Sequence, residues 1–135
     1  MLTRLKIKNL ALIKDITLDF KQGFNLLMGE TGAGKSIILD AVNFALGSKA
    51  DKSLISYGEQ VMKVEACFED YNKQVCDKLS ELDIEDEGLV VISRSLTAEG
   101  KSDIKVNGNT VTLSMLKSLT TFWRTVIHST KIYCY

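Results

Sequence analysis

The fold is decided by residues 24–46, which read FNLLMGETGAGKSIILDAVNFAL. The segment opens with the short apolar run Phe24–Met28, which is typical of a central strand covered on both faces. A glycine-rich loop, Gly29–Ser36, follows at once. After it, apolar residues recur at helical spacing, at Ile38, Leu39, Val42, Ala45 and Leu46. Gly47 suits the end of a helix. The sequence therefore predicts a strand, a loop and a helix in direct succession.

The loop has the spacing G-x-x-x-x-G-K-[ST], in the order Gly29, Glu30, Thr31, Gly32, Ala33, Gly34, Lys35 and Ser36. Its glycines let backbone N–H groups approach a phosphate tail without obstruction by side chains. The following helix adds about half a positive charge at its N-terminus, and Lys35 brings a full charge to the outer phosphates. The Ser36 hydroxyl is a ligand for Mg²⁺. These eight residues are therefore the predicted binding site for ATP with Mg²⁺. A loop that merely caps a helix is the alternative, and the strand and helix on either side argue against it.

Hydrolysis of a bound nucleotide also needs acidic groups, which should follow an apolar strand. The apolar run Leu89–Ile92 leads into Ser93 and Arg94 and offers no carboxylate. The segment Val64–Asp70 ends in acids, but it alternates like a half-exposed strand, and we interpret it as a solvated edge. The sequence predicts a phosphate cradle, and no catalytic residue is assigned.

The flanking segments predict an antiparallel β subdomain in an α/β fold. Residues 2–8 and 12–20 alternate as a strand pair joined near Asn9, and residues 61–68 and 88–96 are further strands. Helical spacing predicts helices over 72–82 and 113–119. Asp103–Val106 with Asn107 and Gly108 predicts a hairpin, because Asn-Gly tolerates the positive φ angles of a tight turn.

Composition is that of one ordinary globular domain, with 135 residues, 45% hydrophobic and 25% charged. Lys plus Arg and Asp plus Glu are 17 each, and no basic stripe predicts direct DNA contact. The three cysteines lack the paired spacing of a metal site, and the single histidine, His128, argues against a Ser-His-Asp hydrolase. No apolar run reaches the length of a membrane span, so we expect a cytoplasmic protein and no membrane partner.

This order of elements resembles the N-terminal half of an ABC-type ATPase head from the SMC-like group, most closely the RecN-like heads. The resemblance covers about residues 1–121. It is carried by an ordered series of segments: Leu5–Ile13, Gly29–Ser36, Ile38–Ala41, Val64–Phe68, Ile92–Arg94, Gly100–Ser102, Val106–Gly108 and Val111–Leu113. The loop alone occurs in many protein families, whereas the whole series is typical of P-loop NTPases of the ABC and SMC type. The resemblance implies that this chain is part of such an ATPase head.

The resemblance implies ATP binding in DNA double-strand break repair and recombination, with a nucleoid-associated location. It implies that a coiled coil separates two half-heads and that the second one, missing here, brings the signature motif and the catalytic acids. Two completed heads then sandwich ATP, and DNA is a partner by resemblance only. Asn9 and Ala11 become possible neighbours of the nucleotide, with a plain turn residue as the alternative for Asn9. The resemblance therefore implies that hydrolysis needs the missing C-terminal half-head.

The resemblance stops after Thr121, which divides the chain into an ATP-binding lobe, 1–121, and a divergent tail, 122–135. Our hypothesis is a truncated or shifted reading frame, which resequencing of the locus would test. Two other functions remain open. A small P-loop kinase would need an arginine-bearing lid, for which only Arg94 and Arg124 follow the loop. A non-functional remnant of a repair ATPase would expose apolar surface and self-associate.

Overall fold

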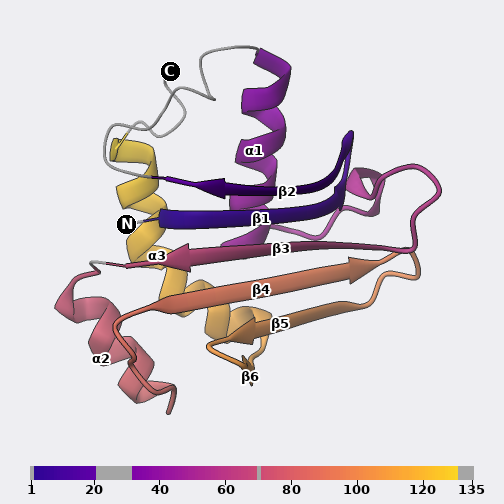
Figure 1. Cartoon of the computed structure of the whole chain (residues 1–135). Coiled ribbons are helices and arrows are strands. Elements are labelled where there is room, and N and C mark those ends of the chain that lie inside the picture. Colours follow the sequence, from indigo (N-terminus) through magenta and orange to yellow (C-terminus); the bar gives the residue numbers. More distant parts are fainter. Residues whose placement is uncertain (1, 21–31, 70, 131–135) are drawn as a thin grey trace.

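The computed structural model describes residues 2–20, 32–69 and 71–130, with side chains described throughout these ranges except at 32–36 and 122–130. Its strands form one antiparallel sheet in the order β2-β1-β3-β4-β5-β6 (Figure 1). The strands are β1 Leu2–Leu10, β2 Ile13–Asp19, β3 Val61–Phe68, β4 Val90–Thr97, β5 Ser102–Val106 and β6 Asn109–Thr110. The predicted antiparallel subdomain is confirmed, and the predicted strand over 24–28 lies outside the described residues.

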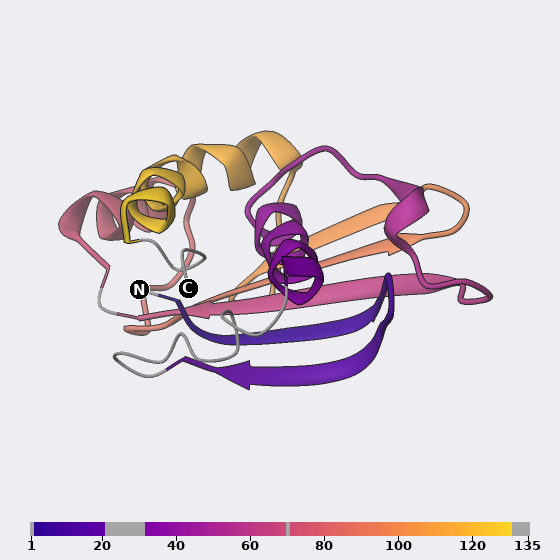
Figure 2. The same cartoon turned by 90° about the horizontal axis from the view of Figure 1, so that it is seen from above.

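The three α-helices of the described residues lie on the same face of the sheet (Figure 2). They are α1 Gly32–Ala45, α2 Lys73–Glu81 and α3 Leu113–Thr130, and a 3₁₀ turn, η2 Lys52–Leu54, follows α1. The opposite face of the sheet is bare wherever the chain is described. A helical layer on one side of an antiparallel sheet places a single core between the two.

That core is built from alternate residues of the strands. Leu5 of β1 lies between Leu18 of β2 and Ala66 of β3, and Ile7 is paired with Val64. Period-two alternation sends these apolar side chains toward the helices and leaves their polar neighbours in solvent. Other fully buried members come from every helix and from the inner strands: Ala41, Phe44, Ala45, Met62, Leu79, Val90, Ile92, Leu116 and Leu119.

The strand over 61–68 is where it was predicted, but its place in the sheet differs from the prediction. The interpretation of Val64–Asp70 as a solvated edge is wrong, because β3 pairs with β1 on one side and with β4 on the other. Its alternating pattern has a different cause, because Met62 and Val64 face the helices while Lys63 and Glu65 face solvent. An alternating pattern indicates that one face of the sheet is exposed to solvent, but it does not indicate whether the strand has one neighbouring strand or two.

Helix α3 is longer than its predicted span of 113–119 and continues to Thr130. The sequence from Leu113 to Thr130 contains no glycine or proline, so nothing local ends the helix earlier. Helix α2 matches its prediction closely. Asn72 caps it, since the Asn72 Oδ1 accepts a hydrogen bond of 3.1 Å from the Val75 N–H.

The predicted Asn-Gly hairpin joins β5 to β6. Asn107 and Gly108 have φ angles of +49° and +84°, as the two central residues of a tight hairpin turn require. The Asn107 side chain also ties the turn to the sheet and to the chain before β4. Its Oδ1 accepts from the Val91 N–H at 2.8 Å, and its Nδ2 donates to the Glu85 carbonyl at 3.2 Å.

We expect Asn107→Ala to lower the free energy of unfolding by about 2 kcal/mol. The variant loses both side-chain hydrogen bonds and leaves a residue that disfavours positive φ in the turn. Asn109→Ala is the matched control, because Asn109 has a negative φ and its side chain bonds only within the hairpin. Urea unfolding of both variants measures the difference, and equal losses would contradict a special role for Asn107.

Candidate functional site

The second half of the predicted loop forms the first turns of α1. Gly32, Ala33, Gly34, Lys35 and Ser36 all lie within this helix, which begins at Gly32. Gly29, Glu30 and Thr31 lie outside the described residues. The first N–H groups of a helix have no partner within it, and they sum to a partial positive charge. The first turn of α1 contains no acidic residue to neutralise it. This helix end therefore suits an anionic group.

Helix α1 is held against the sheet by one apolar face. Ile38, Ala41, Val42 and Ala45 are buried, whereas Asp40 is exposed. The helix packs mainly on the central strand β3 and also contacts β1 and β4. Burial of this face fixes the direction of the helix, and with it the direction in which its first turn points.

The C-terminal end of α1 is closed by a Schellman motif. Gly47 has a φ angle of +113°, its N–H donates to the Phe44 carbonyl, and the Ser48 N–H donates to the Asn43 carbonyl at 3.0 Å. A glycine in this left-handed conformation is the usual way to end a helix. The predicted role of Gly47 is confirmed.

Arg94 of β4 lies beneath this helix end and is only 2% exposed. Its Nη1 donates to the Phe44 and Ser48 carbonyls at 2.8 and 2.5 Å, and its guanidinium lies 4.3 Å from the centre of the Phe44 ring. Burial lowers the pKa of Arg94. Among the described residues no carboxylate forms an ion pair with it.

Sequence reasoning missed this role of Arg94. The sequence suggests a lid arginine of a small kinase, and it includes Arg94 in the segment that carries the family resemblance. A buried guanidinium bonded to backbone carbonyls cannot serve as a mobile lid. The available signal was the position of Arg94, which occupies an inward-facing site in an alternating strand. The side chain of Arg124, the other candidate, is not among those described.

Asn9 and Ala11 lie where β1 turns into β2, with φ angles of +56° and +53°. The loop after η2 holds this turn in place. The Ala11 N–H donates to the Leu54 carbonyl, the Ser56 N–H donates to the Asn9 carbonyl, and the Ser56 hydroxyl donates to the Ala11 carbonyl at 2.6 Å. The Asn9 Nδ2 donates to the Val61 carbonyl. These contacts give Asn9 a structural role in the turn, and its contact with a nucleotide stays a prediction.

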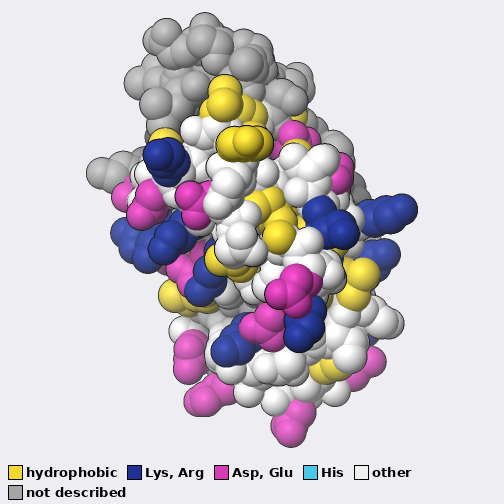
Figure 3. All heavy atoms as spheres, turned by 90° about the vertical axis from the view of Figure 1, so that its right-hand side faces the viewer, with side chains coloured by type: hydrophobic (Ala, Val, Ile, Leu, Met, Phe, Trp, Pro, Cys, Tyr) yellow, Lys and Arg dark blue, Asp and Glu magenta, His cyan; other side chains and the backbone are white. Residues whose placement is uncertain are grey.

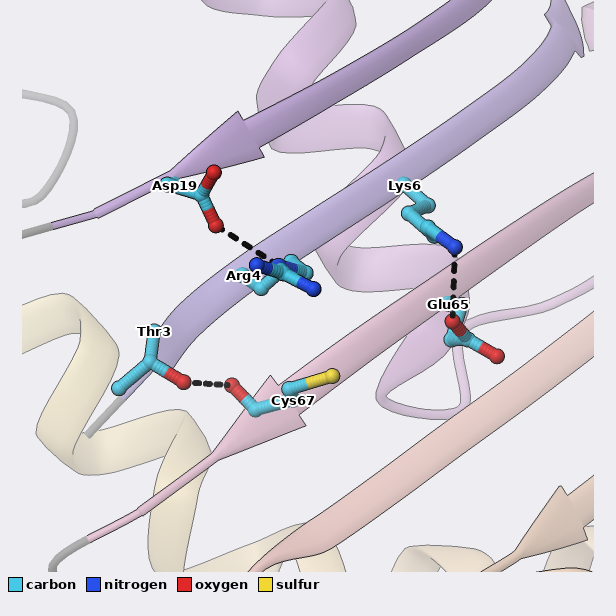
Figure 4. A network of polar contacts seen from close by, with 6 residues as sticks. All are labelled: Thr3, Arg4, Lys6, Asp19, Glu65 and Cys67. Carbon is cyan, nitrogen blue, oxygen red and sulfur yellow. Dashed lines mark hydrogen bonds and ion pairs between the residues drawn. The ribbon is translucent and has the colours of Figure 1, made fainter.

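The bare face of the sheet carries a polar network, drawn in Figure 4. Arg4 pairs with Asp19 at 2.7 Å, Lys6 approaches Glu65 at 4.0 Å, and the Thr3 hydroxyl donates to the Cys67 carbonyl. Exposed pairs of this kind contribute little to stability. Burial raises the pKa of the Cys67 thiol, which argues against a reactive thiolate. This network is a solvated surface rather than a second site.

The described residues contain no group of three His, Cys, Asp or Glu side chains that could hold a metal ion. The helices described here also fall short of the combined length and hydropathy of a membrane-crossing segment.

Comparison with known proteins gives consistent matches. A family described as "AAA domain" matches residues 4–132. DNA repair protein RecN from Halalkalibacterium halodurans is 40% identical over 121 residues, and RecN from Bacillus subtilis is 38% identical over 122 residues. Each alignment covers 88% of this chain and 21% of the relative, so the chain spans about a fifth of the length of these relatives.

Solved structures show the same architecture. One, described as "Structural biochemistry of ATP-driven dimerization and DNA stimulated activation of SMC ATPases", has a TM-score of 0.70 and 26% identity, covering 89% of this chain and 77% of that one. A structure of the recombination mediator protein RecF has a TM-score of 0.65 and 22% identity, covering 86% of this chain and 29% of that one. The second likeness concerns the fold alone.

Proposed function

The chain belongs to the AAA domain family and is homologous to the N-terminal region of the DNA repair protein RecN, and from this premise we propose that it binds ATP with Mg²⁺ through Gly29–Ser36. One observation carries the proposal. The second half of the G-x-x-x-x-G-K-S loop is the start of α1, a helix whose far end is closed and whose apolar face is buried on the sheet. A loop in this position presents its N–H groups in a fixed direction.

The residue types fit the ligand. Backbone N–H groups of 29–34 would hold the phosphates, Lys35 would neutralise the outer ones, and the Ser36 hydroxyl would be a ligand of Mg²⁺. The first N–H groups of α1 have no acceptor within the helix, and its first turn contains no acidic residue, and both features favour an anion. Bound Mg²⁺ would supply charge neutralisation between the outer phosphates.

We further propose that this lobe does not hydrolyse ATP by itself. Glu65, an acidic residue of the central strand β3, belongs to the face of the sheet opposite α1. Strand β4 contains no carboxylate. The acids required for hydrolysis would come from a C-terminal half-head, as expected for a chain that spans a fifth of its relatives.

In the whole protein, the proposed role is a half-head of a DNA repair ATPase that acts in double-strand break repair by recombination, in the bacterial cytoplasm with the nucleoid. The support is homology to RecN and likeness to an SMC ATPase structure whose description speaks of ATP-driven dimerisation and DNA-stimulated activation. A second head would complete the site. The face of the molecule in Figure 3 carries both signs of charge interspersed, so direct DNA contact rests on homology.

Calorimetric titration of the purified chain with Mg-ATP tests the proposal. We expect binding at one site per chain, weaker binding of ATP without Mg²⁺, and no phosphate release above the buffer rate. The absence of any binding would refute the proposal. Phosphate release would show instead that the lobe contains its own hydrolytic groups. Light scattering in the same buffer would reveal the self-association expected of a non-functional remnant.

A further inference from the structure

Two side chains from outside α1 hold its C-terminal end. Arg94 of β4 donates to the Phe44 and Ser48 carbonyls, and the Thr120 hydroxyl of α3 donates to the Leu46 carbonyl at 2.7 Å. Both are among the few buried polar side chains of the described residues, with Arg94 2% and Thr120 0% exposed. We call this pair the α1 clamp.

The α1 clamp restrains movements of α1 that apolar packing does not prevent. The buried face of α1 includes two small residues, Ala41 and Ala45, and apolar contact is not directional. Hydrogen bonds have strict distance and angle requirements, so donors at a helix end oppose both sliding along the axis and rotation about it. A buried carbonyl that loses its donor also bears the cost of an unmade bond.

The other end of the same helix is the predicted phosphate site. Helix α1 has 14 residues and is therefore a rod of about 21 Å with Gly32–Ser36 in its first turns. A rigid rod transmits displacement from one end to the other, and a shift of its N–H groups changes their distance to a bound phosphate.

We propose that the α1 clamp sets the position of the nucleotide-binding helix and that Thr120 makes this position depend on α3. Arg94 and Thr120 are then positioning residues that act through α1 without touching the ligand. Helix α3 packs against α2 and β5, and its hydrogen bond to Leu46 joins it to α1. A movement of α3 would therefore displace the first turns of α1, where the phosphate site is predicted. The proposal rests on ATP binding at Gly29–Ser36.

Thr120→Val tests the clamp, because it removes the hydroxyl and keeps the shape of the side chain. We expect the Kd for Mg-ATP to rise by up to about fivefold, the limit that the free energy of one buried hydrogen bond sets when that bond alone keeps α1 in its binding position. Thr120→Ser should restore the Kd to within about twofold of the wild type. Thr121→Val is the matched control, since the Thr121 hydroxyl donates within α3 to the Lys117 carbonyl and does not reach α1.

A loss of stability alone must be separated from a loss of position. Asn107→Ala removes hydrogen bonds to Val91 and Glu85, which belong to neither α1 nor α3, and should leave the Kd unchanged although it lowers the free energy of unfolding. Titrations are made at a temperature where circular dichroism shows every variant folded. The clamp is overturned if Thr120→Val binds Mg-ATP as tightly as the wild type, or if Asn107→Ala weakens binding equally.

Amide hydrogen exchange without nucleotide distinguishes failure of the clamp from failure of the proposed function. Thr120→Val should speed exchange along residues 37–45, and Thr121→Val should not. If the wild type binds no Mg-ATP, the proposed function fails, and exchange alone decides whether Thr120 holds α1. Equal protection in the two variants would overturn the clamp.

Discussion

Mg-ATP should raise the Tm of the wild-type chain by roughly 10 °C and leave the Tm of Lys35→Ala almost unchanged. A ligand at about a hundred times its Kd stabilises the folded state by about 2.7 kcal/mol, which corresponds to a shift of this size in a domain of this length. Lys35 would contribute a full positive charge beside the outer phosphates, and the alanine variant would keep the backbone N–H groups but lose this charge. Thermal unfolding with and without the ligand measures both shifts.

Lys101→Ala is the control for a general loss of charge, because Lys101 is exposed in the turn between β4 and β5. Its Tm should rise with Mg-ATP as the wild type does. An equal rise in Lys35→Ala would place the nucleotide elsewhere on the chain. No rise in the wild type would indicate that the phosphate loop needs the remainder of the head.

Arg94→Ala should lower the free energy of unfolding by about 3 kcal/mol, with a fall in Tm of roughly 10 °C. The variant loses charged hydrogen bonds to the Phe44 and Ser48 carbonyls and the contact with the Phe44 ring, and it leaves space beneath α1. Two effects reduce this loss of folding free energy. Among the described residues the guanidinium has no carboxylate partner, and a hollow of about 570 Å³ beside it could admit water to the freed carbonyls.

Arg4→Ala is the matched control, since the Arg4 side chain is exposed and its partner Asp19 is exposed as well. Urea unfolding should give nearly the wild-type midpoint for Arg4→Ala and a clearly lower one for Arg94→Ala. Equal midpoints for Arg94→Ala and the wild type would show that the cost of burying the guanidinium cancels everything it contributes.

The local elements could be predicted because each has a strong local cause. Alternation of apolar and polar residues predicts β1 and β3. The glycine-rich loop and Gly47 mark the beginning and the end of α1, and Asn107 with Gly108 predicts the hairpin. These signals lie within a few residues of the structure they specify. The phosphate loop could be named for the same reason, because its chemistry depends on residue types at short spacing.

Features that depend on distant residues could not be predicted in the same way. The central place of β3 is decided by pairing with both β1 and β4, which its own sequence does not encode. In the sequence Arg94 is compatible with a surface or lid residue, because its burial depends on the C-terminal end of α1, which lies over it only in the folded chain. Thr120 is similar, because nothing near it in sequence indicates a bond to Leu46.

The order of strands has a consequence for how the chain folds. Strands β4 and β5 are joined by a short turn, so this hairpin can form early, whereas β3 is connected to β4 through the segment that contains α2. Strand β1 must instead find β3 across the whole intervening segment, as in the pairing of Leu5 with Ala66. Closing that loop is entropically costly and slow. Helix α1 lies within this segment, so we expect the phosphate site to be completed only when β1 has paired with β3.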